Sequence, residues 1–518
     1  MYLTQPLHKS LIECPTRTAT VFGERRRSYA EFVDRVARLA GALKKLGVKP
    51  GDRVAMLGLN SDRYVEYLFG VVWAGAVINP VNIRWSPREI IYSLDDCDSQ
   101  ILLIDDTFLA MLDPLQAGSS SLKTVIYAGD KTAPEGTLSY EDLLADAEPA
   151  EDALRKDKDL AAIMYTGGTT GKPKGVMLSH GNLFADALGS QAVAGLNFRS
   201  VTLHAAPAFH VAGTGLILQS VARLNTNVIL PMFEPKAVMV AAEKEKAQDI
   251  FLVPTMLRML MNHPDFGKHD MSSLRHFMYG ASPMDSALLK RAKAAFPETG
   301  FIQAYGMTEL SPTVTILTAE WHTQKGEDSG RMMSAGQPLP VAEIRIVDGN
   351  DQPVATGTRG EIVVRGPTVM QGYWNKPEQT ADALRGGWMH TGDAGYMDED
   401  GFVFVVDRIK DMIVTGGENV YSAEVEEVVL QMPQILQCAV IGVPDEDWGE
   451  RVHLVVVLKD DATLTQEEVT SHCKQHIANY KVPRSLEIRD EMPMSSAGKL
   501  LKFKLREEHW GDRDRKVS

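Results

Sequence analysis

The sequence is poor in cysteine. It has 4 cysteines in 518 residues, and none lies in a CxxC pair. Wide spacing of this kind argues against a disulfide framework or a cysteine zinc site, and it favours reduced thiols. The N-terminus also lacks the basic stretch followed by an apolar core that is typical of a secretory signal. We therefore expect a cytoplasmic protein.

Positive charge and long apolar runs are scarce as well. The 54 Lys and Arg against 68 Asp and Glu give a net charge of −14. General nucleic-acid binders need a basic face to neutralise phosphates, so no nucleic-acid partner is expected. A nucleotide ligand is still compatible, because a few local cations and backbone N–H groups can hold one. The longest apolar stretch, residues 67–81, is broken by glycine, asparagine and proline, and no transmembrane segment is predicted.

The chain is too long for one hydrophobic core, so we expect two or more domains. The order of its elements predicts an α/β fold. Through about residue 400, helical periodicity alternates with short β-branched runs, as in parallel sheets covered by helices. Beyond Gly401 the pattern changes to short strands, a charged connector and an acidic amphipathic helix. We place a large N-terminal domain of helix-covered sheets at residues 1–406, a hinge at 407–411 and a small α+β domain at 412–518.

The strongest single pattern is a glycine-, threonine- and lysine-rich loop that follows an apolar strand at residues 160–175. Glycines let backbone N–H groups converge, hydroxyls add donors and lysines supply charge, which suits a polyphosphate. A Walker loop would need Gly at position 166 and Ser or Thr at 173. The chain has Thr166 and Pro173, so that alternative fails twice. A flexible surface loop is disfavoured by the lysines and the entering strand.

This segment, YTGGTTGKPKGV, resembles the signature of the adenylate-forming superfamily. That superfamily includes acyl-CoA synthetases, 4-coumarate–CoA ligases, luciferases and peptide-synthetase adenylation domains. The usual motif has serine where this chain has Gly167, which removes one hydroxyl. The resemblance implies that Lys174 holds the loop. It also implies a set of residues that contact the ATP phosphates: Thr166, Gly168, Thr169, Thr170 and Gly171.

Two further motifs match the same family in the same order. The segment YGASP at residues 279–283 supplies small residues that can lie against a flat adenine, namely Gly280, Ala281 and Ser282. In QAYGMTE, residues 303–309, the resemblance implies that Tyr305 stacks on adenine, beside Gly306. It implies that Thr308 donates to the α-phosphate and that Glu309 ligates Mg²⁺ through a hard oxygen.

The C-terminal motifs supply ribose, hinge and lysine roles. Asp393, in WMHTGD, can accept both ribose hydroxyls, and Arg408 adds a second ribose contact. Lys410 stands at the family's hinge position. An isolated C-terminal lysine is usually only solvated, but Lys499 in PMSSAGKL has the spacing of the family's catalytic lysine. The family's small domain rotates about the hinge. Its other face would carry the coenzyme A contacts Gly416, Gly417 and Glu418.

The acyl site is predicted around the segment APAFHVAG, residues 206–213. His210 alone would more often be a packed core histidine, but the resemblance implies a pocket wall or gate. The predicted pocket is apolar and has no cation for a second carboxylate, so a dicarboxylate is disfavoured. A fatty or aryl acid fits it better. Its residues are Phe209, His210, Val211, Gly213, Thr214, Met278, Gly280 and Met307.

Together these motifs predict an ATP-dependent acyl-CoA ligase that uses Mg²⁺. It would convert a hydrophobic carboxylic acid to the acyl-adenylate and pass the acyl group to coenzyme A, releasing AMP and pyrophosphate. One alternative is a free-standing adenylation enzyme that loads a carrier protein. Another is a non-catalytic nucleotide-binding relative, which would be expected to have lost Lys499, Glu309 or Asp393, and all are present. The sequence is compatible with a homodimer.

Overall fold

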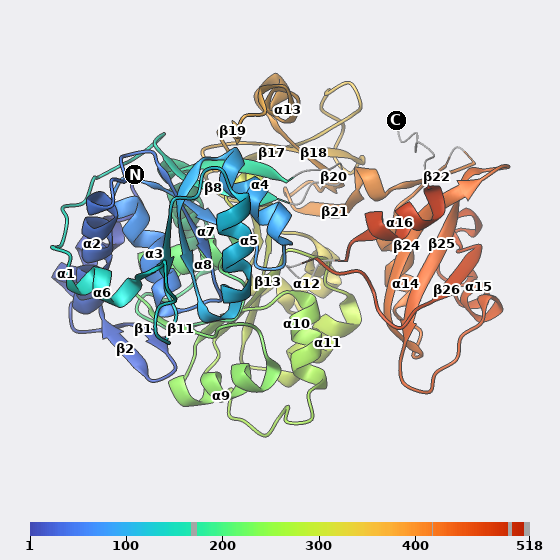
Figure 1. Cartoon of the computed structure of the whole chain (residues 1–518). Helices are drawn as coiled ribbons and strands as arrows, with labels where there is room; N and C mark the ends of the chain where they lie inside the picture. The colour runs from blue at the N-terminus through green and yellow to red at the C-terminus, as the bar shows by residue number, and fades with distance from the viewer. Residues whose placement is uncertain (167–172, 417, 496–499, 512–518) are drawn as a thin grey trace.

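The computed structural model describes residues 1–166, 173–416, 418–495 and 500–511. Figure 1 shows a large body that carries the N-terminus and, beside it, a smaller unit formed by the end of the chain. Every helix in the described ranges is too short or too polar to cross a bilayer. The α/β fold with a large and a small part is as the sequence predicted.

Two large sheets build the body. The strands of the first are β1 (Thr18–Phe22), β2 (Arg25–Ser28), β10 (Val201–His204), β11 (Thr226–Ile229), β12 (Asp249–Phe251), β13 (His276–Gly280), β14 (Gly300–Tyr305), β15 (Thr315–Leu317) and β16 (Gln337–Pro338). Their order is β16-β15-β14-β13-β12-β10-β11-β1-β2. Strands β14, β13, β12, β10, β11 and β1 run parallel, so their carboxyl ends share one edge of the sheet.

The second sheet follows the order β19-β9-β8-β4-β3-β5-β6-β7. Its strands are β3 (Arg53–Leu57), β4 (Val77–Pro80), β5 (Ser99–Ile104), β6 (Thr124–Tyr127), β7 (Leu138–Ser139), β8 (Leu160–Thr166), β9 (Lys174–Ser179) and β19 (Gly372–Tyr373). A smaller antiparallel sheet contains β17 (Glu343–Val347), β18 (Gly360–Arg365), β20 (Met389–Met397) and β21 (Val403–Arg408).

Helices cover both faces of each large sheet. They are α1 (Gln5–Glu13), α2 (Tyr29–Lys45), α3 (Asp62–Trp73), α4 (Pro87–Asp96), α5 (Leu112–Gly118), α6 (Tyr140–Ala145), α7 (His180–Ala194), α8 (Val211–Ala222), α9 (Pro235–Glu245), α10 (Pro254–Asn262), α11 (Ser286–Ala295), α12 (Gln324–Asp328) and α13 (Pro377–Ala383). The largest core joins α2, α3, α7 and α8 to the second sheet. Helices α9, α10 and α11 pack on the first sheet, and α4 and α5 on the outer face of the second.

Local sequence sets the start and the buried face of α2. Ser28 accepts a hydrogen bond from the backbone N–H of Glu31, and the Glu31 carboxylate accepts one from the Ser28 N–H. This capping box satisfies N–H groups that the first turn would leave unpaired. The apolar face of α2 is buried, and Gly47 follows the helix with a φ of +92°. Burial of that face against α3 therefore fixes the helix in the core.

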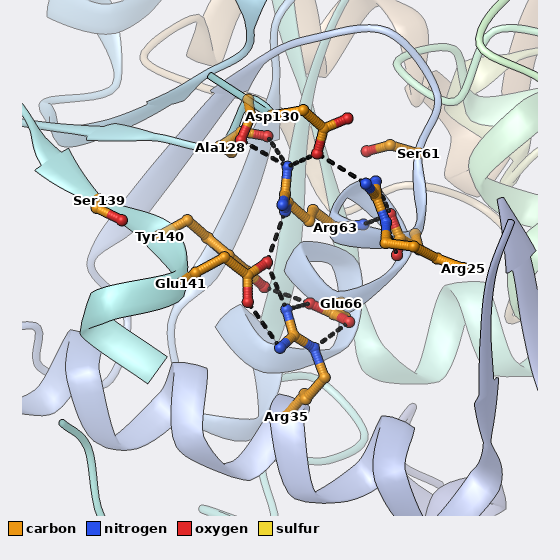
Figure 2. Close-up of polar contacts among 12 residues, drawn as sticks. Arg25, Arg35, Ser61, Arg63, Glu66, Ala128, Asp130, Ser139, Tyr140 and Glu141 are labelled. Carbon is orange, nitrogen blue, oxygen red and sulfur yellow. Dashed lines mark hydrogen bonds and ion pairs between the residues drawn. The ribbon is translucent and has the colours of Figure 1, made fainter. Parts of the chain in front are cut away.

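A dense ion-pair network joins four elements at one end of the body (Figure 2). Arg35 of α2 makes bidentate contacts with both Glu66 of α3 and Glu141 of α6. Arg63 of α3 reaches Glu141 at 2.8 Å and Asp130 at 2.9 Å. Glu66 is completely buried, so its charge depends on these partners. The network ties α2, α3 and α6 together.

The small unit begins where the chain leaves β21. A 3-10 helix, η6 (Ile409–Asp411), separates β21 from the next sheet, so the predicted hinge residue Lys410 lies between two sheets. That sheet contains β22 (Ile413–Thr415), β23 (Glu418–Val420), β24 (Ile435–Asp445), β25 (Gly449–Leu458) and β26 (Ser485–Ile488). Its helices are α14 (Ser422–Val429), α15 (Gln466–Lys474) and α16 (Lys502–Trp510). The predicted acidic helix coincides with α14.

Candidate functional site

The backbone packs closely at the carboxyl ends of β13 and β14. These parallel strands pair with Gly280 opposite Ala304. A Cβ atom on Gly280 would lie 2.2 Å from the Ala304 carbonyl oxygen, and one on Gly306 would lie 1.9 Å from that of Pro312. Both positions therefore require glycine. Ala281 follows with a left-handed φ of +66°, next to Ser282. The carboxyl edge of parallel strands is a common place for nucleotides.

Three predicted nucleotide residues, Tyr305, Asp393 and Arg408, meet at this edge. The Tyr305 hydroxyl donates to Asp393 Oδ2 at 2.7 Å, and Arg408 Nε lies 2.9 Å from Asp393 Oδ1. Antiparallel pairing of β20 with β21 sets Asp393 directly opposite Arg408. Burial and the Asp393 carboxylate raise the pKa of Tyr305, so it remains a phenol and a donor at neutral pH. The arrangement presents a buried carboxylate held by a phenol and a guanidinium.

A second buried carboxylate lies just beyond β14. Glu309 belongs to the 3-10 helix η2 (Thr308–Leu310), which Met307 precedes and Thr308 starts. The Tyr373 hydroxyl donates to Glu309 Oε1 at 2.9 Å, while Oε2 has no partner within the described ranges. An anionic oxygen left free in a site that is 7% exposed is a suitable hard ligand for Mg²⁺. The residues present therefore fit the predicted ion.

The strands on either side of the predicted phosphate loop are linked to this carboxylate through Lys174 and Tyr373. Strands β8 and β9 are antiparallel, with Thr166 opposite Lys174. Lys174 Nζ lies 4.8 Å from the centre of the Tyr373 ring, a cation–π contact that links the loop to Glu309 through Tyr373. The predicted phosphate contacts Gly168, Thr169, Thr170 and Gly171 lie outside the described residues, as does the predicted lysine Lys499.

The structure adds Tyr373, to which the sequence analysis assigned no role. It stands in β19 next to β9, with Tyr373 opposite Val176. Burial, followed by the Glu309 charge, raises its pKa, so it too donates as a phenol. A tyrosine in the segment GYWNKP gives no sequence signal for this role, because the contact depends on pairing between strands almost two hundred residues apart.

A cavity lies between the first sheet and α8. It is lined by Thr202, Leu203, His204, Ala205, Ala206, Gly213, Leu216, Phe251 and Met278. Of the predicted acyl residues it contains Gly213 and Met278. A Cβ on Gly213 would lie 2.1 Å from the Pro207 carbonyl oxygen, so glycine is needed for this close approach.

The remaining predicted acyl residues surround the start of α8 and the end of β14. Phe209 and Val211 pack in the core between the large sheets, and Met307 packs against its edge. Thr214 Oγ1 donates to the Ala208 carbonyl at 2.6 Å. His210 is the N-cap residue of α8, and its ring lies 4.4 Å from that of Phe209. Their acyl-binding roles stay predictions.

Two polar cavity residues, Thr202 and His204, are absent from the predicted set. They stand on the same face of β10 because side chains alternate along a strand. The sequence signal was present, since VTLHAA places a polar residue at every second position of a short apolar strand. Only the sheet topology shows that this face lines the cavity.

Two of the predicted coenzyme A residues, Gly416 and Glu418, lie in the small unit at the end of β22 and the start of β23. Gly416 follows β22 with a φ of +58°, and its N–H donates to the Trp448 carbonyl at 2.9 Å. Glu418 is exposed and pairs with Thr415, while Gly417 lies outside the described residues. Lys410 is exposed in η6. No contact joins Gly416 or Glu418 to the Asp393 cluster among the described residues.

One hydrogen bond connects the small unit with the body near the predicted lysine. Arg84, in the loop after β4, donates through Nη1 to the Ser495 carbonyl at 3.1 Å. Ser495 precedes Lys499 by four residues. The beginning of the PMSSAGKL segment is therefore held against the large body.

Family models match nearly the whole chain. Residues 7–374 match "AMP-binding enzyme" and residues 424–499 match "AMP-binding enzyme C-terminal domain". The chain is 39% identical to a feruloyl-CoA synthase from Amycolatopsis sp., with 95% of this chain and 96% of that protein covered. It is 35% identical to the fatty acid–[acyl-carrier-protein] ligase ScoC of Streptomyces coeruleorubidus, with 97% and 96% covered.

Solved structures show the same architecture. An anthranilate CoA ligase, AuaEII, in complex with anthranoyl-AMP superimposes with a TM-score of 0.89 at 28% sequence identity. The superposition covers 98% of this chain and 97% of that one. The likeness therefore extends over both the body and the small unit.

Proposed function

The chain belongs to the AMP-binding enzyme family, and we propose that it is an ATP-dependent acid–thiol ligase that forms an acyl-adenylate and then an acyl-CoA. The observation that carries this proposal is the pair of buried carboxylates at the edge of β13 and β14. Asp393 is suited to ribose hydroxyls, and Glu309 to a metal that neutralises phosphate. Lys174 of β9 contacts the ring of Tyr373, whose hydroxyl holds Glu309.

The first step brings two anions together, so it depends on positioning and positive charge. A carboxylate oxygen of the acid forms a bond to the α-phosphorus of ATP, and the bond to the bridging oxygen breaks as pyrophosphate leaves. We infer that Thr308, at the start of η2, donates to the α-phosphate and that Lys174 of β9, opposite Thr166, holds the phosphate loop. Mg²⁺ held by Glu309 would neutralise phosphate charge.

The second step transfers the acyl group. The thiolate of coenzyme A attacks the acyl carbonyl, the bond from that carbon to the AMP oxygen breaks, and the thiol proton passes to solvent. We infer that Lys499 acts in the first step and that rotation about Lys410 then presents Gly416 and Glu418. The free cysteines suit the reducing cytoplasm in which we place this chemistry.

The acid is hydrophobic. The cavity beside α8 has mainly apolar walls and contains no lysine or arginine. The relative that is named a feruloyl-CoA synthase supports an aryl acid, whereas ScoC supports a fatty acid and, as acceptor, an acyl carrier protein. Loading of a carrier protein is therefore the second candidate function.

A screen for pyrophosphate release tests the proposal. Straight-chain, aryl and arylpropanoid acids would be offered with ATP, alone, with coenzyme A or with an acyl carrier protein. We expect acid-dependent release, and acyl-CoA as the product when coenzyme A is present. Release that yields product only on a carrier protein would favour the second candidate. Absence of acid-dependent release would refute both.

A further inference from the structure

Two histidines and a glutamate from three different elements of the small unit face one another. His453 lies in β25, Glu487 in the neighbouring strand β26 and His509 near the end of α16. The Nε2 atoms of His453 and His509 each lie 3.3 Å from the same carboxylate oxygen, Glu487 Oε2. The three potential ligand atoms all lie within 4.8 Å of one another. Two imidazole nitrogens and a carboxylate oxygen are a common ligand set for zinc.

The two 3.3 Å separations fit a bound metal better than a direct hydrogen bond. A hydrogen bond from N–H to a charged oxygen is usually about 2.7–2.9 Å long when the donor is charged as well. Ligand atoms about 2.0–2.1 Å from a tetrahedral zinc ion are about 3.3–3.4 Å apart, because the edge of a tetrahedron is about 1.63 times its centre-to-corner distance. The separations in this cluster therefore match the edges of a zinc coordination tetrahedron.

Neighbouring side chains prepare His453 and Glu487 as ligands. His453 Nδ1 lies 2.7 Å from Ser485 Oγ, and a proton donated from Nδ1 leaves the lone pair of Nε2 facing Glu487. Arg489 Nε donates to the other carboxylate oxygen, Glu487 Oε1, while its Nη atoms bind Glu508. Because Glu508 compensates the charge of Arg489, the charge of Glu487 is left for a cation.

A second cluster of the same residue types, Asp351, Glu361 and His390, lacks these features. His390 Nδ1 lies 2.8 Å from Glu361 Oε2, which is an ordinary hydrogen-bond distance. Arg385 contacts both oxygens of Asp351 and also Glu361, so a guanidinium already compensates these carboxylates. We therefore assign no metal to that cluster.

We propose that His453, Glu487 and His509 form a zinc site that fastens α16 to the sheet of the small unit, with water as the fourth ligand. Figure 1 shows α16 beside β24, and Leu505 of this helix packs with apolar residues of β24 and β25. The zinc ion and the apolar contact hold the helix at different points. Arg506 of α16 also pairs with Asp411 of η6, so the ion stabilises a helix that contacts the predicted hinge.

Zinc titration of the full-length protein tests the proposal directly. The protein would be stripped of metal with a chelator and titrated with ZnCl₂ in a calorimeter. Excess Mg²⁺ would keep the proposed magnesium site at Glu309 filled. We expect one zinc ion per chain with a Kd of about 1 μM or lower, and Co²⁺ in its place should give the intense visible absorption of a tetrahedral site. Absence of zinc binding, or binding only at millimolar concentrations, would overturn the proposal.

Variants assign the ion to this cluster. His509→Gln removes one ligand near the end of the last helix. Zinc affinity should then fall by about 100-fold or more, since loss of a ligand's hydrogen-bond partner alone costs about 10- to 100-fold. Ser485→Ala removes only the partner of His453 Nδ1 and should weaken binding by about 10-fold. His476→Gln is the matched control, because His476 is an exposed histidine of the small unit outside the cluster, and it should bind zinc as the wild type does.

Hydrogen–deuterium exchange locates the ion without relying on affinity. Zinc should slow exchange of the α16 amides in the wild type and in His476→Gln, but not in His509→Gln. Wild-type zinc affinity in folded His509→Gln, or unchanged α16 exchange when zinc binds the wild type, would contradict the site. If His509→Gln does not fold, Glu487→Gln replaces it, and the exchange measurement on the unaltered protein still decides the question. These measurements need no ATP, acid or coenzyme A, so their outcome is independent of the proposed ligase activity.

Discussion

At the scale of single residues, the site depends on carboxylates whose geometry is set by phenols. Asp393 is held between Tyr305 and Arg408, and Glu309 by Tyr373. In each pair a tyrosine proton satisfies one carboxylate oxygen and orients the other. The motifs predicted both acids and Tyr305, because they stand in short, recognisable segments. Tyr373 could not be predicted, since its role arises only when β19 pairs with β9.

The first prediction concerns Asp393. Asp393→Asn keeps the shape but removes the charge opposite Arg408, which weakens the proposed ribose contact. We expect the KM for ATP in ATP–pyrophosphate exchange to rise about 10- to 100-fold, with little change in the KM for the acid. Asp382→Asn is a control at an exposed position of α13. An unchanged KM for ATP would contradict the ribose role.

The second prediction concerns Glu309 and the phenol that orients it. Glu309→Gln removes the anionic ligand and should lower kcat for pyrophosphate release by about 100-fold or more. Tyr373→Phe removes the hydrogen bond that orients this carboxylate, and it should lower kcat for pyrophosphate release by about 10-fold. Single-turnover quench measurements would separate these losses from slow product release. A Tyr373→Phe enzyme with wild-type kcat would show that the phenol has no positioning role.

At the scale of elements, the sequence predicted alternating helices and strands and an acidic helix beyond Gly401, and the structure has both. The sequence did not predict which distant strands pair with one another, because the partners of a strand depend on the whole sheet. That is why the cavity face of β10, with Thr202 and His204, escaped the sequence analysis although its alternation was visible. The ion pairs that join α2, α3 and α6 were not predicted either, because they depend on how the three helices pack together.

A third prediction follows from that network. Burial opposes the charge of Glu141, but hydrogen bonds from Arg35 and Arg63 outweigh it and lower its pKa to about 2. A lowered pKa stabilises the fold above the unfolded value of 4.5, and this contribution is lost as pH falls from 4.5 towards 2. Glu141→Gln should therefore lower Tm at pH 7 by about 2 °C, with the difference from wild type shrinking below pH 4.5.

Thermal melts from pH 7 down to pH 3 would measure this effect, with Glu148→Gln as the control at an exposed acid that makes no ion pair in the described structure. The control should track wild type throughout. A Glu141→Gln difference that grows as the pH falls would contradict the assigned sign.

At the scale of the whole molecule, the two-part chain suits a two-step reaction. The sheet changes at η6, and Arg84 of the body holds the segment before Lys499 through Ser495. We infer that this arrangement serves the first step and must open for the second. The sequence predicted the two parts, and the hinge at Lys410 stays a prediction. It did not predict the contact between Arg84 and Ser495, which lie more than four hundred residues apart.

A fourth prediction tests this arrangement. Arg84→Cys combined with Ser495→Cys would be joined by a bis-maleimide linker with a cleavable internal disulfide. The joined enzyme should release pyrophosphate once and retain acyl-adenylate, but form acyl-CoA at least about 10-fold more slowly, until reduction restores the rate. Wild type treated in the same way controls for its own cysteines. Normal acyl-CoA formation in the joined enzyme would show that the contact need not open.

The central claim is that the acid's own oxygen becomes bonded to the α-phosphorus. The most direct measurement uses an arylpropanoid acid labelled with ¹⁸O in both carboxylate oxygens, with ATP and coenzyme A, and mass spectrometry of the products. If the reaction passes through an acyl-adenylate, we expect AMP that carries one ¹⁸O atom and an acyl-CoA that keeps the other. Unlabelled AMP, or ¹⁸O in pyrophosphate or inorganic phosphate, would contradict the account.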